Sequence, residues 1–189
     1  EYSHRRHSNS HIRFTIMILL WLIILLMAGG FFAWIAERWS PLLTRGISLL
    51  VLVVNFVLSL YLCTQQLEMI ERSQSNWLIQ YVLPWIPSFG ISFNLALDGL
   101  SLLMLLLTFF LGILAVLISW NEIQYKIGFF HFNLLWVLAG ITGVFITMDL
   151  FLFYFFWEVM LIPMYLLIGI WGHENRRYAA YKFFIFTQA

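Results

Sequence analysis

Long runs of uncharged, apolar residues recur along this chain and limit what it can fold into. Each run approaches or exceeds the roughly 20 residues that an α-helix needs to cross about 30 Å of hydrocarbon. Because lipid offers no hydrogen-bond partners, a spanning backbone forms helices or a closed barrel, and these runs lack the two-residue alternation of barrel strands. The sequence therefore predicts an all-α membrane protein, a polytopic bundle of transmembrane helices. Five complete spans are expected, at about residues 11–35, 47–62, 99–120, 129–148 and 150–171.

The composition supports a membrane protein and excludes several other classes. Hydrophobic residues make up 62% of the chain and charged residues 10%, whereas globular proteins are about half apolar and a quarter charged. A net charge of +1 gives no electrostatic basis for binding nucleic acid. The single cysteine, Cys63, excludes an internal disulfide. It also excludes an iron-sulfur cluster held by this chain alone, since such clusters need about four thiolates.

The one sizeable polar loop is predicted at residues 65–97. Its prolines and glycine are typical of turns, and its tryptophans are typical of side chains anchored at a membrane interface. The residues that carry these signals are Pro84, Trp85, Pro87 and Gly90. They favour a folded segment over a flexible linker.

The two ends of the chain are both unusual. Residues 178–189 are largely apolar but would reach only about 18 Å as a helix, so we expect the start of a sixth span. Residue 1 is not Met, and the first methionine, Met17, falls almost at the start of the first apolar run. We therefore hypothesise that translation begins at Met17 and that the polar tail 1–16 is an upstream extension. The alternative is a genuine basic tail.

Positive charges predict how the helices are oriented, because Lys and Arg in short loops are retained on the cytoplasmic side. Counted from Met17, six Lys and Arg residues lie on one side of the predicted membrane, and only Arg72 lies on the other. The six are Arg38, Arg45, Lys126, Arg176, Arg177 and Lys182. This count places the 65–97 loop and Asp149 outside. Including the three arginines of the tail weakens the ratio to six against four.

One carboxylate, Glu158, lies well inside a predicted span. It follows Leu150 by eight residues and precedes Trp171 by thirteen, which puts it close to the membrane midplane. Burying a charged group at that depth costs about 2.5 to 3.5 kcal/mol on insertion scales, so such residues usually face the bundle interior and mark an ion pathway. We interpret Glu158 as a residue that transfers protons. The structural alternative is a protonated side chain that only forms a hydrogen bond to a neighbouring helix.

Two tyrosines and a proline accompany Glu158 on the same predicted helix. At 100° per residue, Tyr154 and Tyr165 lie within about 40° of Glu158, so their hydroxyls could hold water beside it as a relay. Tyrosines in an aromatic-rich helix also serve packing or the membrane interface, which is the alternative. Pro163 cannot donate to the carbonyl of Val159 and should kink the helix beside Glu158.

Four other polar residues lie near predicted helix ends. Asp98 and Asp149 precede the third and fifth spans, where a short side-chain oxygen can accept from free backbone N–H groups as an N-cap. His131 and His173 lie near the inner ends of the fourth and fifth spans. A pair of axial haem ligands is conceivable, but two isolated histidines are a weak signal, and residues at the membrane interface are the default interpretation.

Three segments of the chain resemble a known family. Residues 128–172 read GFFHFNLLWVLAGITGVFITMDLFLFYFFWEVMLIPMYLLIGIWG, residues 84–104 read PWIPSFGISFNLALDGLSLLM, and residues 182–189 read KFFIFTQA. They closely resemble the chain M family of bacterial NADH-quinone oxidoreductase, respiratory complex I, an antiporter-like membrane subunit. DGLS is shared across antiporter-like subunits, whereas FWE followed by LIP and MYLLIGIWG is more specific to chain M. The likeness extends from Met17 onward.

The resemblance implies a subunit of about fourteen helices with two inverted five-helix repeats, each a proton half-channel. Residues 17–128 would be the first three helices and 129–189 the start of the first repeat, so the chain would be an amino-terminal fragment. Glu158 falls on the family's functional glutamate, which pairs with lysines on later helices that this sequence does not contain.

The same resemblance implies partners and a location. The chain itself would bind no cofactor or metal, while NADH, FMN, iron-sulfur clusters and quinone would belong to partner subunits of complex I in the bacterial inner membrane. The expected function is proton translocation driven by electron transfer in those partners. The alternatives are an Mrp-type cation/proton antiporter subunit, a haem- or quinone-binding anchor, and a passive scaffold.

Overall fold

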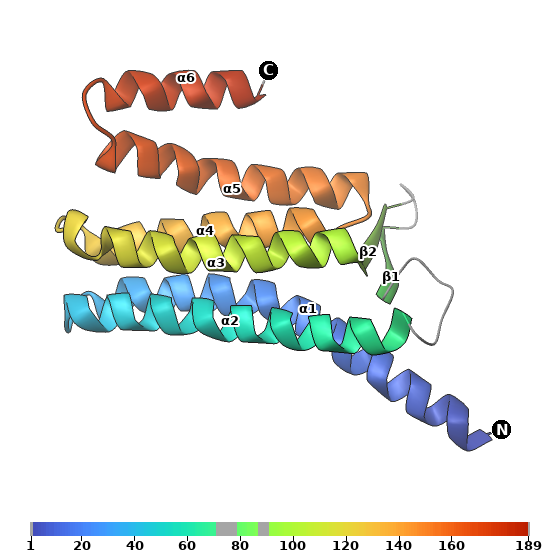
Figure 1. The fold of residues 1–189 in the computed structure, drawn as a ribbon. Helices are drawn as coiled ribbons and strands as arrows, with labels where there is room; N and C mark the ends of the chain where they lie inside the picture. The colour runs from blue at the N-terminus through green and yellow to red at the C-terminus, as the bar shows by residue number, and fades with distance from the viewer. Residues whose placement is uncertain (1, 71–78, 87–90, 189) are drawn as a thin grey trace.

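The computed structural model describes residues 2–70, 79–86 and 91–188, and the surroundings of side chains within 17–65 and 94–188. Long helices run alongside one another, and a small hairpin lies at one end of them (Figure 1). The helices are α1 (Tyr2–Ala36), α2 (Pro41–Ile70), α3 (Gly99–Glu122), α4 (Ile127–Ile146), α5 (Leu150–Trp171) and α6 (Arg176–Gln188).

Five segments of these helices are long and apolar enough to cross a membrane, which confirms the predicted polytopic helical fold. They are Met17–Ala36, Pro41–Gln65, Gly99–Glu122, Ile127–Ile146 and Leu150–Trp171. The sixth helix, α6, has 13 residues. The chain is therefore a multi-pass membrane protein.

Several helix ends differ from the predicted spans because caps and tertiary contacts, rather than hydropathy, decide where a helix stops. The second span was expected to begin near residue 47, but α2 begins at Pro41, where a proline needs no N–H partner. The hydroxyl of Ser40 accepts from the Leu42 N–H at 3.2 Å and so caps this end. At the amino end, α1 already begins at Tyr2 and includes most of the predicted tail.

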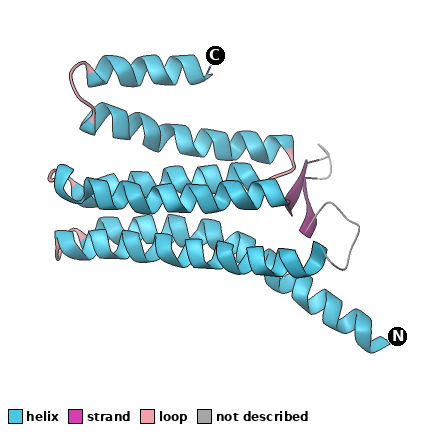
Figure 2. Cartoon of the chain, viewed as in Figure 1, coloured by secondary structure: helices cyan, strands magenta, loops and turns pink. Residues whose placement is uncertain are grey.

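The polar loop is folded, as predicted, but it contains strands that the sequence analysis did not anticipate. Strand β1 (Ile79–Ile86) pairs antiparallel with β2 (Ile91–Leu97) and forms the hairpin drawn in magenta in Figure 2. Of the four turn and anchor residues, Pro84 and Trp85 lie in β1, while Pro87 and Gly90 lie outside the described residues. The hairpin therefore replaces the irregular loop that proline and glycine had indicated.

The hairpin is attached to the turn between α4 and α5. The Met148 N–H donates to the Asn94 carbonyl at 2.9 Å, and Leu95 forms a β-bridge with Thr147. Because Thr147 and Met148 take part in this pairing, α4 ends at Ile146, two residues earlier than expected. The contact places the polar loop and Asp149 at the same end of the bundle, consistent with the charge count.

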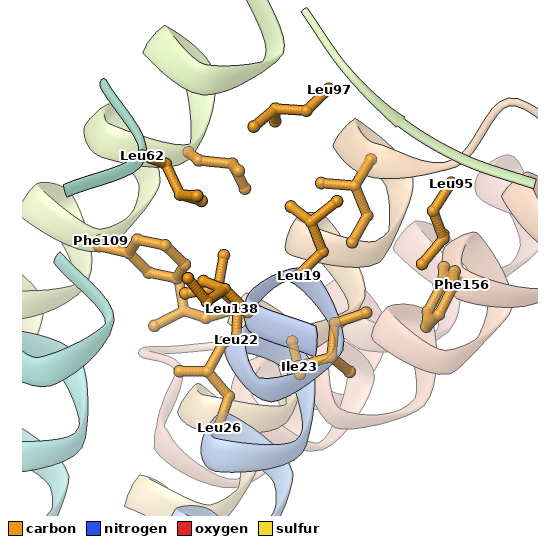
Figure 3. Close-up of a cluster of buried hydrophobic side chains, with 14 of the residues drawn as sticks. Leu19, Leu22, Ile23, Leu26, Leu62, Leu95, Leu97, Phe109, Leu138 and Phe156 are labelled. Carbon is orange, nitrogen blue, oxygen red and sulfur yellow. The ribbon is translucent and has the colours of Figure 1, made fainter. Parts of the chain in front are cut away.

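The apolar core lies among α1, α2, α3 and α4 and reaches the hairpin and α5. Figure 3 shows Leu19 and Leu22 of α1 near Phe109 of α3 and Leu138 of α4. Glycine allows close approach here, since a Cβ on Gly112 of α3 would lie 2.8 Å from a methyl of Leu138. Such small-residue contacts are typical of membrane helices, whose association depends on tight van der Waals packing.

Several buried hydroxyl groups of α2 and α4 bond within their own helices, unlike the Thr44 hydroxyl of α2, which donates to the Ala33 carbonyl of α1 at 3.2 Å. Ser48 donates to the Thr44 carbonyl at 2.9 Å, Ser59 to Asn55 at 3.0 Å, and Thr142 to Leu138 at 2.8 Å. Because the bonds of Ser48, Ser59 and Thr142 run to carbonyls one turn earlier, these groups need no partner from another helix.

His131 is buried inside the bundle near the start of α4, and its place at the level of the membrane interface stays a prediction. Its side chain is fully buried in α4, and Nδ1 lies 2.8 Å from the Ile127 carbonyl oxygen. That bond to its own helix compensates part of the cost of burying an imidazole. His173 is exposed in the turn after α5, as expected for an end residue.

Candidate functional site

Asp149 fixes the start of α5, the helix that carries the candidate site. Its carboxylate accepts from the backbone N–H groups of Phe151 at 2.9 Å and Leu152 at 3.2 Å. This geometry confirms the predicted N-cap. The hairpin holds the preceding residue, so both the start of α5 and its attachment to α4 are set within a few residues of the cap.

Asp98 caps α3 in the same way, as predicted. Its Oδ1 accepts from the Ser101 N–H at 2.8 Å. Hydrogen bonds from the side chain and backbone of Ser101 hold the pKa of Asp98 below its usual value, because they stabilise the ionised carboxylate. Both predicted caps therefore fix the starts of their helices.

Close packing against α4 fixes which face of α5 is turned inward. A Cβ on Gly140 would lie 2.7 Å from the Cβ of Met160, and a Cβ on Gly143 would overlap the ring of Phe156. Met160 and Phe156 lie four residues apart and so share one face of α5. Glu158 lies about 160° around the helix from Met160, so it points away from α4.

Glu158 is half-buried and is bonded to another helix. Its Oε2 accepts a hydrogen bond from Nε2 of Gln188 on α6 at 2.7 Å. The α6 ribbon folds back alongside α5 in Figure 1, which brings together residues thirty positions apart. A carboxylate eight residues into a spanning helix therefore has a neutral donor from a neighbouring helix.

The two tyrosines of the predicted relay have different surroundings. Tyr154, one turn before Glu158, forms a side-chain hydrogen bond with the carboxylate and is itself 57% exposed. Tyr165 instead bonds to Tyr181 of α6, with their ring centroids 5.9 Å apart. Tyr154 and Glu158 are thus brought together, whereas Tyr165 is bonded to α6.

Pro163 lies inside α5 and is buried against the bundle. The helix continues through it from Leu150 to Trp171. Since proline has no N–H, the Val159 carbonyl beside Glu158 lacks its usual donor from Pro163. A kink at this point stays a prediction.

Gln188 is the contact residue that sequence reasoning missed. Helical periodicity within α5 identifies Tyr154 and Tyr165, but a partner from another helix depends on how α6 packs. The segment KFFIFTQA contains the residue and carries the family resemblance, yet nothing in it indicates which side chain faces Glu158.

The groups bonded to Glu158 among the described residues are neutral. Among the described residues, no group of three His, Cys, Asp or Glu side chains comes together as a metal site. Glu158 has one amide donor and one phenol within hydrogen-bonding reach, and no cation is among its bonded partners there. A carboxyl group in such surroundings can take up and release a proton without a bound ion.

Residues 147–189 match the family described as NADH:quinone oxidoreductase/Mrp antiporter, TM. The chain is 54% identical over 182 residues to NADH-quinone oxidoreductase subunit M of Pseudomonas aeruginosa, covering 92% of this chain and 36% of that protein. It is 50% identical over 180 residues to the same subunit of Escherichia coli, covering 92% of this chain and 35% of that protein. The chain thus spans about a third of the length of these curated relatives.

Two solved structures share the fold. Respiratory complex I from Thermus thermophilus with bound NADH contains a chain that matches with a TM-score of 0.71 and 26% identity, over 90% of this chain and 32% of that one. The membrane-bound sulfane sulfur reductase, an archaeal respiratory membrane complex, matches with a TM-score of 0.73 and 19% identity, over 89% of this chain and 33% of the other. The second likeness concerns the fold alone.

The fold and these matches define the class of the protein as a polytopic helical membrane protein that matches the NADH:quinone oxidoreductase/Mrp antiporter transmembrane family at residues 147–189. Within that class, the chain belongs to the family of NADH-quinone oxidoreductase subunit M. The resemblance seen in the sequence is thereby confirmed.

Proposed function

We propose that this chain forms part of a proton-translocating membrane subunit of NADH-quinone oxidoreductase, with Glu158 as the group that carries the proton. The observation that carries the proposal is the Glu158 carboxylate, half-buried within a spanning helix and bonded to Gln188 of α6 at 2.7 Å. Carboxylates at this depth are costly and mark ion pathways. The matches to subunit M support the same assignment.

Glu158 would alternate between two states. A carboxylate binds a proton arriving through water and becomes neutral, and it releases the proton when its surroundings again favour the charged form. Approach or withdrawal of a cation on a later helix would switch between the two states, because a nearby opposite charge favours the carboxylate. Tyr154 would be the hydroxyl that passes a proton to or from it.

The chain would transfer no electrons itself. NADH, FMN, iron-sulfur clusters and quinone would be bound by partner subunits, and this chain would respond to their redox chemistry through the membrane part of the complex. The proposed location is the bacterial inner membrane, as the subunit names of the relatives suggest. The partners would then be the other membrane subunits of complex I.

The test is to substitute Glu158 in the full-length subunit within the assembled complex. Glu158→Gln and Glu158→Ala should strongly reduce proton pumping and the coupled reduction of quinone, because neither side chain can exchange a proton. Glu158→Asp should retain part of both activities. Pumping is measured as acidification or quenching of a pH-sensitive dye in vesicles, per quinone reduced.

A matched control uses the same chemical change outside the membrane. Glu174 lies exposed in the turn between α5 and α6, so Glu174→Gln should pump normally. Near-normal pumping by an assembled Glu158→Gln complex would refute the assignment of Glu158.

A stand-alone Mrp-type cation/proton antiporter subunit is the second candidate, because the matching family includes such proteins. It would use the same glutamate but exchange ions without quinone reduction. Copurification with quinone-reducing subunits favours the first proposal, and ion exchange that is independent of NADH favours the second.

A further inference from the structure

A stripe of residues along α6 lies against the face of α5 that carries Glu158. Ala180, Phe184 and Gln188 recur every four residues and so share one face of α6. A Cβ on Gly169 of α5 would lie 3.6 Å from the Cβ of Ala180, which lets the helices approach closely near the turn. The contacts along the stripe begin there and end at Gln188.

The middle of the stripe fixes the rotation of α6. The rings of Phe184 and Tyr165 meet edge to face with centroids 5.8 Å apart, and Tyr165 also contacts Tyr181 at 5.9 Å. Edge-to-face aromatic pairs are favourable and directional. Gln188, one turn beyond Phe184, is therefore directed to Glu158 by packing over the preceding turns.

Among the described residues of α5 and α6, the other charged and titratable groups do not take the place of the Gln188 amide as the interhelical donor to Glu158. On α5, Tyr154 is the titratable side chain bonded to Glu158. On α6, Tyr181 is bonded to Tyr165, and Nζ of Lys182 lies 5.9 Å and 5.8 Å from the ring centroids of Tyr178 and Phe186. The face of α5 that packs on α4 is the opposite one. Within the described residues, Gln188 is thus the interhelical donor to the carboxylate.

We propose that Gln188 is a positioning residue that holds the Glu158 carboxylate in its ionised, proton-accepting state, an inference that rests on the proposed function. A hydrogen bond to an ionised acceptor is stronger than one to a neutral acceptor, so the amide N–H favours the charged form. After protonation, the amide oxygen can accept from the carboxyl O–H, because glutamine has both a donor and an acceptor. Gln188 can thereby bond to the carboxyl group in both of its protonation states.

The test compares Gln188→Met with the unmodified, assembled complex. Methionine has a similar length but offers no N–H, so packing is retained while the bond to the carboxylate is lost. The pH profile of protons pumped per quinone reduced should move upward by about one pH unit, the size expected from one hydrogen bond to a charged group. Vesicles are assayed across the whole pH range at saturating NADH and quinone.

Thr187→Val is the matched control on the adjacent residue. The Thr187 hydroxyl donates to the Phe183 carbonyl of its own helix, so its loss should leave the pH midpoint unchanged. A Gln188→Met profile that coincides with the unmodified one overturns the inference, as does a uniform loss of pumping at every pH. Both results leave the role of Glu158 intact, because that role is decided by Glu158→Gln.

Gln188→Glu provides a second variant should Gln188→Met fail to assemble. A second carboxyl beside Glu158 disfavours ionisation of the pair and should move the midpoint in the same direction and further. An unchanged midpoint in this variant overturns the inference.

Discussion

Buried hydroxyl groups of the α1–α4 bundle, apart from that of Thr44, bond within their own helices, whereas Glu158 of the α5–α6 pair bonds to a side chain of the neighbouring helix. In the bundle, Ser48, Ser59 and Thr142 are buried and donate to carbonyls of their own helices. In the α5–α6 pair, Glu158 and Tyr165 bond to side chains of the neighbouring helix. Bonds within a helix survive a shift of that helix, whereas bonds between helices depend on their relative position.

Burial differs between α4 and α5. A larger part of α4 than of α5 is buried within the described structure. α4 lies among other helices in Figure 1, whereas α5 presents a face with exposed aromatic side chains such as Phe151 and Phe155. The α5–α6 pair carries the carboxyl group whose hydrogen bond depends on the relative position of two helices.

The largest effect is expected from a substitution that disrupts the packing of α4 against α5. Gly143→Ala would place a Cβ on the ring of Phe156, so α4 and α5 must separate or the ring must move, at a cost of about 1 to 3 kcal/mol. We expect a lower thermal midpoint of the assembled complex and reduced pumping. The measurement is thermal unfolding of the purified complex in detergent.

Gly46→Ala is the control for that substitution. A Cβ on Gly46 would meet no atom within 4 Å, so alanine should be neutral or stabilise α2 by about 0.5 to 1 kcal/mol. Equal destabilisation by the two substitutions would show that α4 and α5 are not packed as described.

A smaller effect distinguishes bonds between helices from bonds within a helix. Tyr165→Phe keeps the ring but removes the hydroxyl bonded to Tyr181, so α6 should be held less firmly against α5. Thr142→Val removes a bond that stays within α4 and should have no effect on α6. Hydrogen exchange of α6 amides in the assembled complex should rise in the first variant alone. A rise of equal size in both would contradict the comparison.

Much of the fold follows from the sequence because lipid imposes simple rules. An apolar run of sufficient length must be helical, and a short acidic residue before it caps the helix, as Asp98 and Asp149 do. The hairpin at 79–97 was missed because proline and glycine indicate turns without indicating the pairing between them. Its strands are defined by their partners, including the turn before Asp149.

The site was partly predictable for a related reason. Periodicity places Tyr154 on the face of Glu158, and the structure brings them together. The same periodicity does not indicate what the neighbouring helix presents, so the bond of Tyr165 to Tyr181 and that of Gln188 to Glu158 could not be predicted. The position of Glu158 within its predicted span identified the carboxylate. Its partner, Gln188, depends on how α6 packs against α5.

Infrared difference spectroscopy of the working complex tests the central claim most directly. During turnover with NADH and quinone, protonation of a buried carboxylate produces a carbonyl stretching band and loss of carboxylate bands. The account predicts such a band in the unmodified complex and in Glu174→Gln, and its absence in Glu158→Gln. A Glu158→Gln complex with the same carboxyl bands as the unmodified one would contradict the claim that Glu158 carries the proton.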